Sequence, residues 1–305
     1  MSSESPKNIP ASVHQRLLNK ARTEGRPFQE LLQYFFMERF LYRLSLSSYS
    51  DRFVLKGALM LQVYDRASTR PTMDIDLEGI IGNSIQEITN AVRKISKIEV
   101  EPDDGIKFDT DSIRAEQITE DAEYEGIRVR FTGALGKATR SMQIDIGFGD
   151  VIVPAPIDVE LTPILDFPAP RLLGYPKETK VAEKFHAMVQ LGEINSRMKD
   201  FYDIWLLSRK QEFDGNILFR AIHEKFIQRE LNLETHPVAF SDGFGNDPAR
   251  QQMWSAFLKK SSLHDAPEDF LEVIVWIRQF LGPVSVAAAR GEDFGRTWPP
   301  GGPWE

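Results

Sequence analysis

The chain has 305 residues, 42% of them hydrophobic and 27% charged, a balance that supports a sizeable core and excludes a globally disordered protein. The absence of cysteine excludes disulfide scaffolds, cysteine nucleophiles, iron–sulfur clusters and thiolate zinc sites, and no uninterrupted apolar run reaches the roughly 18 residues typical of a membrane helix. Without such a run, we expect a soluble, cytoplasmic protein. The net charge of −8 is unevenly distributed: residues 1–70 carry +5, residues 71–170 carry −11 and residues 171–305 carry −2, so a basic N-terminal part precedes an acidic middle.

The N-terminal part is predicted to be helical. Apolar residues at helical spacing predict one helix from about residue 11 to Gly25 and a second over residues 28–47. We predict a third helix over residues 53–64, with Gly57 at a place where another backbone approaches closely. The excess of Lys and Arg here fits either a surface that faces a polyanion or ordinary solvated helix faces.

The middle of the chain is predicted to form a sheet. Pro71 keeps Arg70 out of the helical conformation, and residues 73–80 alternate polar and apolar side chains as a half-buried strand does. Turn residues separate the later segments of alternating character. We predict further strands over residues 106–118, 124–135 and 141–149, and a helix over residues 84–98.

Asp74 and Asp76 carry the sharpest chemical signal. Residues i and i+2 of a strand point to the same face, so the two carboxylates lie side by side, and a cation normally offsets their repulsion. Mg²⁺ prefers such oxygen ligands; a water-exposed strand end is the structural alternative. Asp145 alternates with apolar residues on a later predicted strand. If the two strands are neighbours, Asp145 adds a third carboxylate, as in a two-metal site for displacement at phosphorus.

Four residues near this motif are candidates for phosphate contacts. Lys56 and Gly57 lie upstream, where glycine lets backbone N–H groups approach a phosphate. Thr72 shares the strand face of Asp74, so its hydroxyl is placed to donate to a phosphate oxygen, and Arg70 lies just before it.

The rest of the chain is predicted to be mostly helical. The proline-rich residues 153–176 are predicted to be irregular with one short strand, and we place a domain boundary near residue 170. The predicted parts are a domain over residues 1–170, a helical domain over 171–289 and an irregular Gly- and Pro-rich tail over 290–305. Helices are predicted over residues 177–194, 195–211, 215–232, 248–261 and 266–281.

Two of these helices contain charged residues that need an explanation. Lys184 lies within an amphipathic helix, where a lysine usually extends to solvent. Asp200 and Asp203 share a helical face, although aspartate is a poor residue for a helix interior. An i, i+4 ion pair between Lys199 and Asp203 is a purely structural explanation.

Five segments in order resemble the AbiEii/AbiGii toxin family of nucleotidyltransferases, which includes the MenT toxins. The segments are LKGALML, RPTMDIDLEG, MQIDIGFGD, VAEKFHAMV and RMKDFYDIWLL, and the resemblance covers about residues 25–210. It implies an α+β fold: a nucleotidyltransferase core similar to that of DNA polymerase β, with a mixed sheet, N-terminal helices and a C-terminal helical bundle that completes the nucleotide site. It also implies transfer of a nucleoside monophosphate from a nucleoside triphosphate (NTP).

The resemblance assigns roles to particular residues. It makes Asp74, Asp76 and Asp145 the catalytic carboxylates that bind Mg²⁺, or Mn²⁺ in its place. Gly57 and Thr72 then belong to the nucleotide-binding turn, with Lys56 and Arg70 beside them, although Ala58 stands where the family often has a second glycine. Lys184 resembles the lysine that holds the triphosphate. Asp200 and Asp203 match the last catalytic motif, and the sequence does not decide between them.

The resemblance also implies partners. Such toxins are encoded beside an antitoxin, and some members transfer nucleotides to the 3′ end of tRNA, which stops translation. A protein or small-molecule acceptor, or a non-catalytic nucleotide-binding module, are the alternatives, and the sequence does not identify the NTP. By charge clustering, an RNA acceptor is expected to contact Arg16, Lys20, Arg22, Arg26, Arg39 and Arg43.

Overall fold

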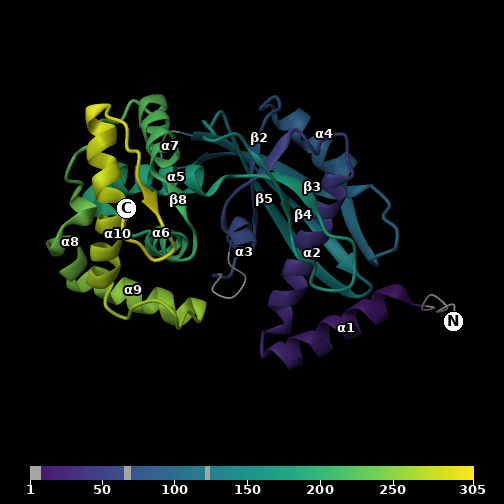
Figure 1. Cartoon of the computed structure of the whole chain (residues 1–305). Helices are drawn as coiled ribbons and strands as arrows, with labels where there is room; N and C mark the ends of the chain where they lie inside the picture. The colour runs from purple at the N-terminus through teal and green to yellow at the C-terminus, as the bar shows by residue number, and fades with distance from the viewer. Residues whose placement is uncertain (1–7, 65–69, 121–123) are drawn as a thin grey trace. The chain divides into compact units, whose positions relative to one another are not determined.

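The computed structural model describes residues 8–64, 70–120 and 124–305, which divide into two compact units (Figure 1). The first unit comprises Met1–Leu59, Thr72–Gly149 and Asp158–Gly174, and the second comprises Met60–Pro71, Asp150–Ile157 and Tyr175–Glu305. The single boundary predicted near residue 170 therefore differs from this division, because two short inner segments also belong to the second unit. The periodicity of apolar residues does not show where the chain passes from one unit to the other.

A mixed sheet forms the centre of the first unit. In the described residues, seven strands follow the order β3-β4-β5-β2-β1-β7-β6. Neighbours β2 and β5 are parallel, as are β1 and β7, whereas β1–β2, β3–β4 and β4–β5 are antiparallel. The predicted mixed sheet is thus confirmed. The strands are β1 Phe53–Leu55, β2 Ile75–Gly79, β3 Ile106–Glu120, β4 Tyr124–Leu135, β5 Ala138–Phe148, β6 Ile157–Glu160 and β7 Arg171–Gly174.

Helices cover the apolar face of this sheet. They are α1 Ile9–Glu24, α2 Phe28–Ser45 and α4 Ile85–Ser96, close to the predicted bounds. The rings of Phe36 and Phe40 on α2 contact Phe108 on β3, and Phe40 also contacts Phe131 on β4. Because side chains alternate along each strand, the polar residues of β2, β4 and β5 share the opposite face.

The helix predicted over residues 53–64 is wrong in its first part. Residues Phe53–Leu55 form strand β1, and helical structure begins only with a short 3₁₀ turn, Ala58–Met60, and α3, Leu61–Tyr64. Gly57 has a φ of +66°, the left-handed conformation, which a continuous helix does not tolerate. The atoms nearest to a Cβ on Gly57 belong to the Asp76 side chain rather than to a backbone, and the backbone contact lies one residue earlier, where Lys56 N–H donates to Asp76 O at 2.9 Å.

The second unit is a helical bundle, as predicted. Its long helix α10 is, among the described residues, the one helix long and apolar enough to cross a membrane by length and composition. Val273, Ile277 and Phe280 on it have no exposed surface, so α10 has the character of a core helix. The other helices are α5 Lys177–Leu191, α6 Met198–Lys210, α7 Gly215–Gln228, α8 Asp242–Asn246 and α9 Pro248–Ser261, and α10 is Phe270–Arg290.

The Gly- and Pro-rich tail contains one short strand in otherwise irregular chain, and it packs into this unit. Strand β9, Thr297–Trp298, pairs with β8, Phe213–Asp214. Trp298 is buried and donates to Ser208 O at 2.6 Å, and Trp304 donates to Phe280 O at 2.8 Å. The Gly and Pro content suggested irregular structure, but these tryptophans anchor the segment to the core.

Candidate active site

Three carboxylates converge on the polar face of the sheet in the first unit. Asp74 directly precedes β2, Asp76 lies on β2, and Asp145 lies on β5 directly opposite Asp76. One ligand oxygen from each lies within 4.8 Å of the others. The sequence predicted this grouping on the condition that the two strands are neighbours, and the structure fulfils that condition.

The chain around Asp74 and Asp76 is shaped to hold these carboxylates. Thr72 Oγ1 donates to Asp74 Oδ1 at 2.5 Å. A Cβ atom on Gly57 would overlap the Asp76 carboxylate, so only glycine leaves room for it. The Thr72 hydroxyl, predicted to contact a phosphate, therefore orients Asp74 in this structure.

Lys56 is engaged on the same side of the sheet. Its ammonium lies 3.0 Å from Glu78 Oε2, and both side chains are nearly buried. A Cβ on Gly147 would lie 2.7 Å from Lys56 Nζ, so this glycine makes room for the pair. The predicted contact of Lys56 with a nucleotide is compatible with this placement and stays a prediction.

Asp145 has a cationic partner that the sequence analysis missed. Arg128 on β4 lies directly opposite it and donates from Nε to Oδ1 at 2.8 Å and from Nη2 to Oδ2 at 2.7 Å. This pairing raises the pKa of Arg128, chiefly through the hydrogen bond to Asp145. Strand alternation placed Arg128 on the polar face, but only the strand register shows which carboxylate it meets.

The three carboxylates fit a divalent cation. Like charges this close repel one another unless a cation offsets them, and Arg128 provides one positive charge against three negative ones. Oxygen-only ligands of this kind suit Mg²⁺ or Mn²⁺ rather than metals that prefer nitrogen or sulfur. The site could therefore hold a metal ion through Asp74, Asp76 and Asp145.

A second group of charges lies within the helical unit. Lys184 on α5 lies 2.5 Å from Asp200 Oδ1 and 2.8 Å from Asp203 Oδ2, both on α6. Its side chain is only 12% exposed, so it does not extend to solvent. The structure thus brings together the three residues that the sequence proposed for this part of the chain.

Two arginines complete this group. Arg70 donates to Asp203 at 2.9 and 3.2 Å, and Arg197, which the sequence analysis did not propose as a site residue, donates to Asp200 at 2.6 Å. Asp203 meets Lys184 and Arg70 here, whereas the predicted structural pair was with Lys199.

The neighbouring cations keep the carboxyl groups of Asp200 and Asp203 ionised. Burial works against the charged form of Asp200, but Lys184 and Arg197 outweigh it and hold the pKa of Asp200 below its usual value. Burial likewise opposes the charge on Asp203, yet Arg70 and Lys184 lower its pKa. Asp200 is consequently a weak candidate for a general base, because a base works best with a pKa near the working pH.

A buried lysine, Lys180, lies one helical turn before Lys184. Burial lowers its pKa to about 7, against the opposing effect of the Asp203 charge. Its burial has no signal in the sequence, since a lysine on an amphipathic helix is usually solvated.

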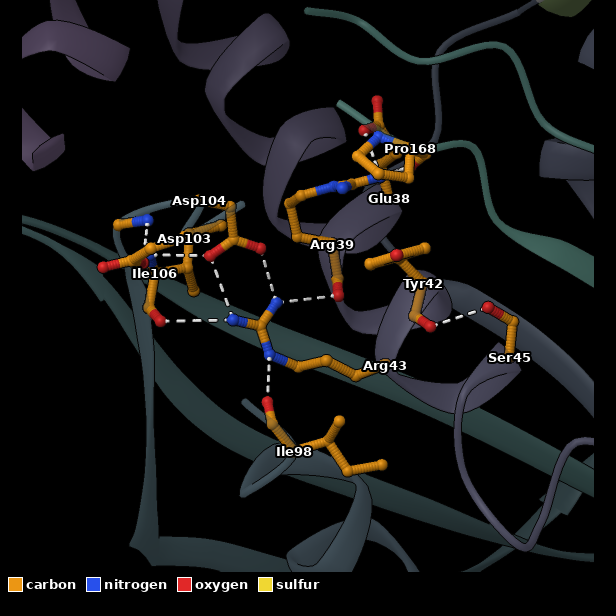
Figure 2. Close-up of polar contacts among 11 residues, drawn as sticks. Glu38, Arg39, Tyr42, Arg43, Ser45, Ile98, Asp103, Asp104, Ile106 and Pro168 are labelled. Carbon is orange, nitrogen blue, oxygen red and sulfur yellow. Dashed lines mark hydrogen bonds and ion pairs between the residues drawn. The ribbon is translucent and has the colours of Figure 1, made fainter. Parts of the chain in front are cut away.

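The structure corrects part of the predicted RNA-facing surface, because Arg43 is buried. Its guanidinium donates to both carboxylate oxygens of Asp104, at 2.7 and 2.9 Å, and to the carbonyls of Arg39 and Ile98 (Figure 2). The prediction that Arg43 contacts RNA from the surface is therefore wrong. The i, i+4 spacing on α2 placed it on one face with Arg39, but that face is turned inward.

Arg39 is buried as well, so the same prediction is wrong for it. It donates to Pro168 O at 2.7 Å and stacks 4.6 Å from the centre of the Tyr42 ring (Figure 2). Arg39 Nη2 also lies 2.8 Å from Oε1 of its neighbour Glu38. Burial raises the pKa of Glu38 to about 7.

The four basic residues of α1 and the following turn keep some exposed surface. Three are paired with carboxylates: Arg16 with Asp166 at 3.2 Å, Lys20 with Glu24 at 2.9 Å and Arg26 with Glu30 at 2.6 Å. Arg22 is exposed. The predicted basic surface is thus smaller and more neutralised than its charge count suggested.

A family model described as the nucleotidyl transferase AbiEii toxin of a type IV toxin–antitoxin system matches residues 39–275. The chain belongs to this family. The resemblance drawn from the five motifs is thereby confirmed, and the chain is a nucleotidyltransferase. Membership of this AbiEii family implies an NTP substrate and an antitoxin partner.

Two crystal structures from Helicobacter pylori are similar in fold to this AbiEii family member. JHP933 has 14% sequence identity and a TM-score of 0.47, with 86% of this chain and 93% of that chain covered. A protein described as a proposed nucleotidyltransferase has 15% identity and a TM-score of 0.45, with 86% and 96% covered. No curated protein matches the chain.

Proposed function

We propose that this enzyme uses Mg²⁺ to transfer a nucleoside monophosphate from an NTP to an RNA acceptor, most simply the 3′ end of tRNA, and thereby blocks translation. The observation that carries the metal-dependent part is the convergence of Asp74, Asp76 and Asp145 within 4.8 Å. When bound there, the metal would neutralise negative charge on the reacting phosphate oxygens.

The protein's own residues would prepare this chemistry. Asp74 is held by Thr72, Asp76 occupies the space left by Gly57, and Asp145 is held by Arg128, so the carboxylates are oriented before any ligand binds. Preorganised groups of this kind need little rearrangement during the reaction, which lowers its barrier.

Lys184 is the proposed triphosphate-binding residue. Asp200 and Asp203 fix its ammonium and raise its pKa, against the effect of burial, so it stays protonated at neutral pH. A fixed, protonated amine is a suitable partner for phosphate oxygens. A Lys184→Met variant should therefore raise the KM for the NTP.

The RNA acceptor rests on the family's known acceptors and on the cations of α1 and the following turn that keep some exposed surface. Arg16, Lys20, Arg22 and Arg26 are the remaining candidates for contacts with an RNA backbone. Action on tRNA would place the enzyme in the cytoplasm.

Label transfer tests this function directly. The purified enzyme is incubated with Mg²⁺, total bacterial tRNA and each of the four α-labelled NTPs in turn. Asp74→Ala is the inactive variant, and Asp158→Ala, which removes an exposed carboxylate of β6, is the matched control. We expect label on tRNA from the wild type and Asp158→Ala only.

Other outcomes redirect or reject the proposal. Label on protein in a bacterial extract, with none on tRNA, would replace RNA by a protein acceptor. Equal labelling by Asp74→Ala would reject the carboxylate site. Full labelling without added metal and in excess chelator would reject Mg²⁺ dependence.

A further inference from the structure

A row of polar side chains extends from the proposed metal site across four strands of the sheet, β2, β5, β4 and β3. The cross-strand register places Glu116 of β3 opposite Arg128 of β4, and Arg128 opposite Asp145 of β5. Asp145 in turn lies opposite Asp76 of β2. Four charged side chains thus form one row, and the single cation of the row lies next to the carboxylate that completes the triad.

The contacts of Arg128 fix the Asp145 carboxylate in one orientation. Its Nε and Nη2 donate to different oxygens of Asp145, at 2.8 and 2.7 Å. Such a two-pronged bond sets the plane of the carboxylate, which a single hydrogen bond to a lysine does not. Arg128 keeps 29% of its side chain exposed and Asp145 only 7%, so the bond lies at the edge of the buried region.

A third donor acts on the same carboxylate. Gln143 Nε2 donates to Asp145 Oδ2 at 3.2 Å. The Gln143 amide cannot turn over freely, because Arg130 donates to its Oε1 at 3.2 Å while bonding Glu116 at 2.5 Å. The network therefore continues from Asp145 through Gln143 to Arg130, which links it to Glu116 of the same row.

The Asp145 carboxylate keeps a lone pair that could bind a cation. Each carboxylate oxygen accepts about two bonds. Among the described residues, Asp145 Oδ2 accepts from Arg128 and Gln143, whereas Oδ1 accepts from Arg128 alone. One lone pair of Oδ1 thus stays available to a ligand.

We propose that Arg128, assisted by Gln143, is a positioning residue that presents Asp145 to the divalent cation through its two-pronged hydrogen bond. The inference rests on the proposed metal-dependent function. Its alternative is that Arg128 only balances the charge of the three carboxylates. The two differ in what they require, because positioning needs the geometry of the guanidinium and charge balance needs only a positive charge.

Binding of Mn²⁺ without nucleotide, followed by electron paramagnetic resonance, separates them. Arg128→Lys keeps the positive charge but loses the pair of N–H donors that bonds both oxygens of Asp145. We expect it to bind Mn²⁺ at least about tenfold more weakly than the wild type, as is typical when a residue that orients a metal ligand is changed. Its label-transfer activity should recover as Mn²⁺ is raised. The matched control is Arg114→Lys, because Arg114 donates to the carbonyls of Asp111 and Ile113.

Four further variants complete the test. Arg128→Gln should also weaken Mn²⁺ binding; tighter binding by Arg128→Gln, or wild-type binding by Arg128→Lys, would overturn the inference. If the Arg128 variants fail to fold, Gln143→Leu decides, with weaker Mn²⁺ binding expected and unchanged binding contradicting it. Asp74→Asn and Asp145→Asn report on the site itself: if both bind Mn²⁺ like the wild type, the proposed metal site fails, independently of Arg128.

Discussion

Asp76 and Asp145 lie directly opposite each other on the neighbouring parallel strands β2 and β5. Their neighbours Ile75 and Ile144 are fully buried on the other face of the sheet. A slip of one residue in this register would turn Asp145 into the apolar core. The packing of the core face thus fixes the position of the acidic groups on the polar face.

We predict that Asp76→Asn abolishes nucleotide transfer without unfolding the protein. Turnover should fall by about a thousandfold, because a bound cation contributes several kcal/mol to the reaction and each 1.36 kcal/mol is a factor of ten. The free energy of unfolding should stay the same or rise, because one of three repelling charges is removed. Label transfer and urea denaturation measure the two effects. An active Asp76→Asn enzyme would contradict the site.

We predict that Gly57→Ala disables the site through Asp76. The new Cβ would overlap the Asp76 carboxylate, so metal binding should be lost in addition to a backbone penalty of about 1–2 kcal/mol for alanine in the left-handed conformation. Gly25→Ala is the control, because Gly25 has a φ of +65° but no atom within 4 Å of the added Cβ. Similar Mn²⁺ binding by both variants would show that Gly57 has no role beyond its conformation.

The sequence predicts an element correctly where a single local pattern, such as the alternation of polar and apolar residues, is enough to identify it. Alternation identified β2 and β5, and the i, i+2 spacing of Asp74 and Asp76 placed both on one face. The segment over residues 53–64 was misassigned because a short apolar run is compatible with a buried strand or a helix, and only pairing with β2 settles which forms.

Contacts between distant residues could not be predicted in this way. Arg128 and Asp145 meet because β4 and β5 pair in one particular register, and Lys184 meets Asp200 because α5 and α6 pack together. The burial of Arg39 and Arg43 has the same origin, since charge clustering along α2 does not show that this helix is enclosed on nearly all sides.

We predict that Arg43→Ala destabilises the fold rather than weakening a surface contact with RNA. It would leave the Asp104 carboxylate buried without its main cation, which typically costs about 3–5 kcal/mol of unfolding free energy. Arg22→Ala, on the exposed face of α1, should change stability by less than about 0.5 kcal/mol. Urea denaturation of both variants checks this. A stability of Arg43→Ala equal to that of Arg22→Ala would restore Arg43 as a surface candidate.

The pH dependence of stability should reveal Lys180. Its pKa is about 7 in the folded protein, chiefly because of burial, whereas in the unfolded chain it takes the ordinary lysine value of 10.5. Above pH 10.5 both states are neutral and the residue has no effect. As the pH falls from 10.5 to 7, the unfolded chain binds a proton that the folded protein does not, so stability falls. Below pH 7 the penalty is constant.

Lys180→Met removes this penalty. We expect the stability of the variant relative to the wild type to be higher at pH 7 than above pH 10.5, by roughly 4–5 kcal/mol, since 3.5 pKa units separate the two states at 1.36 kcal/mol each. The gain should shrink steadily as the pH approaches 10. Urea denaturation at pH 7, 8.5 and 10 measures the gain. A gain independent of pH would mean that Lys180 titrates normally, and a gain that grows as the pH rises would mean that its attraction to Asp203 exceeds the effect of burial.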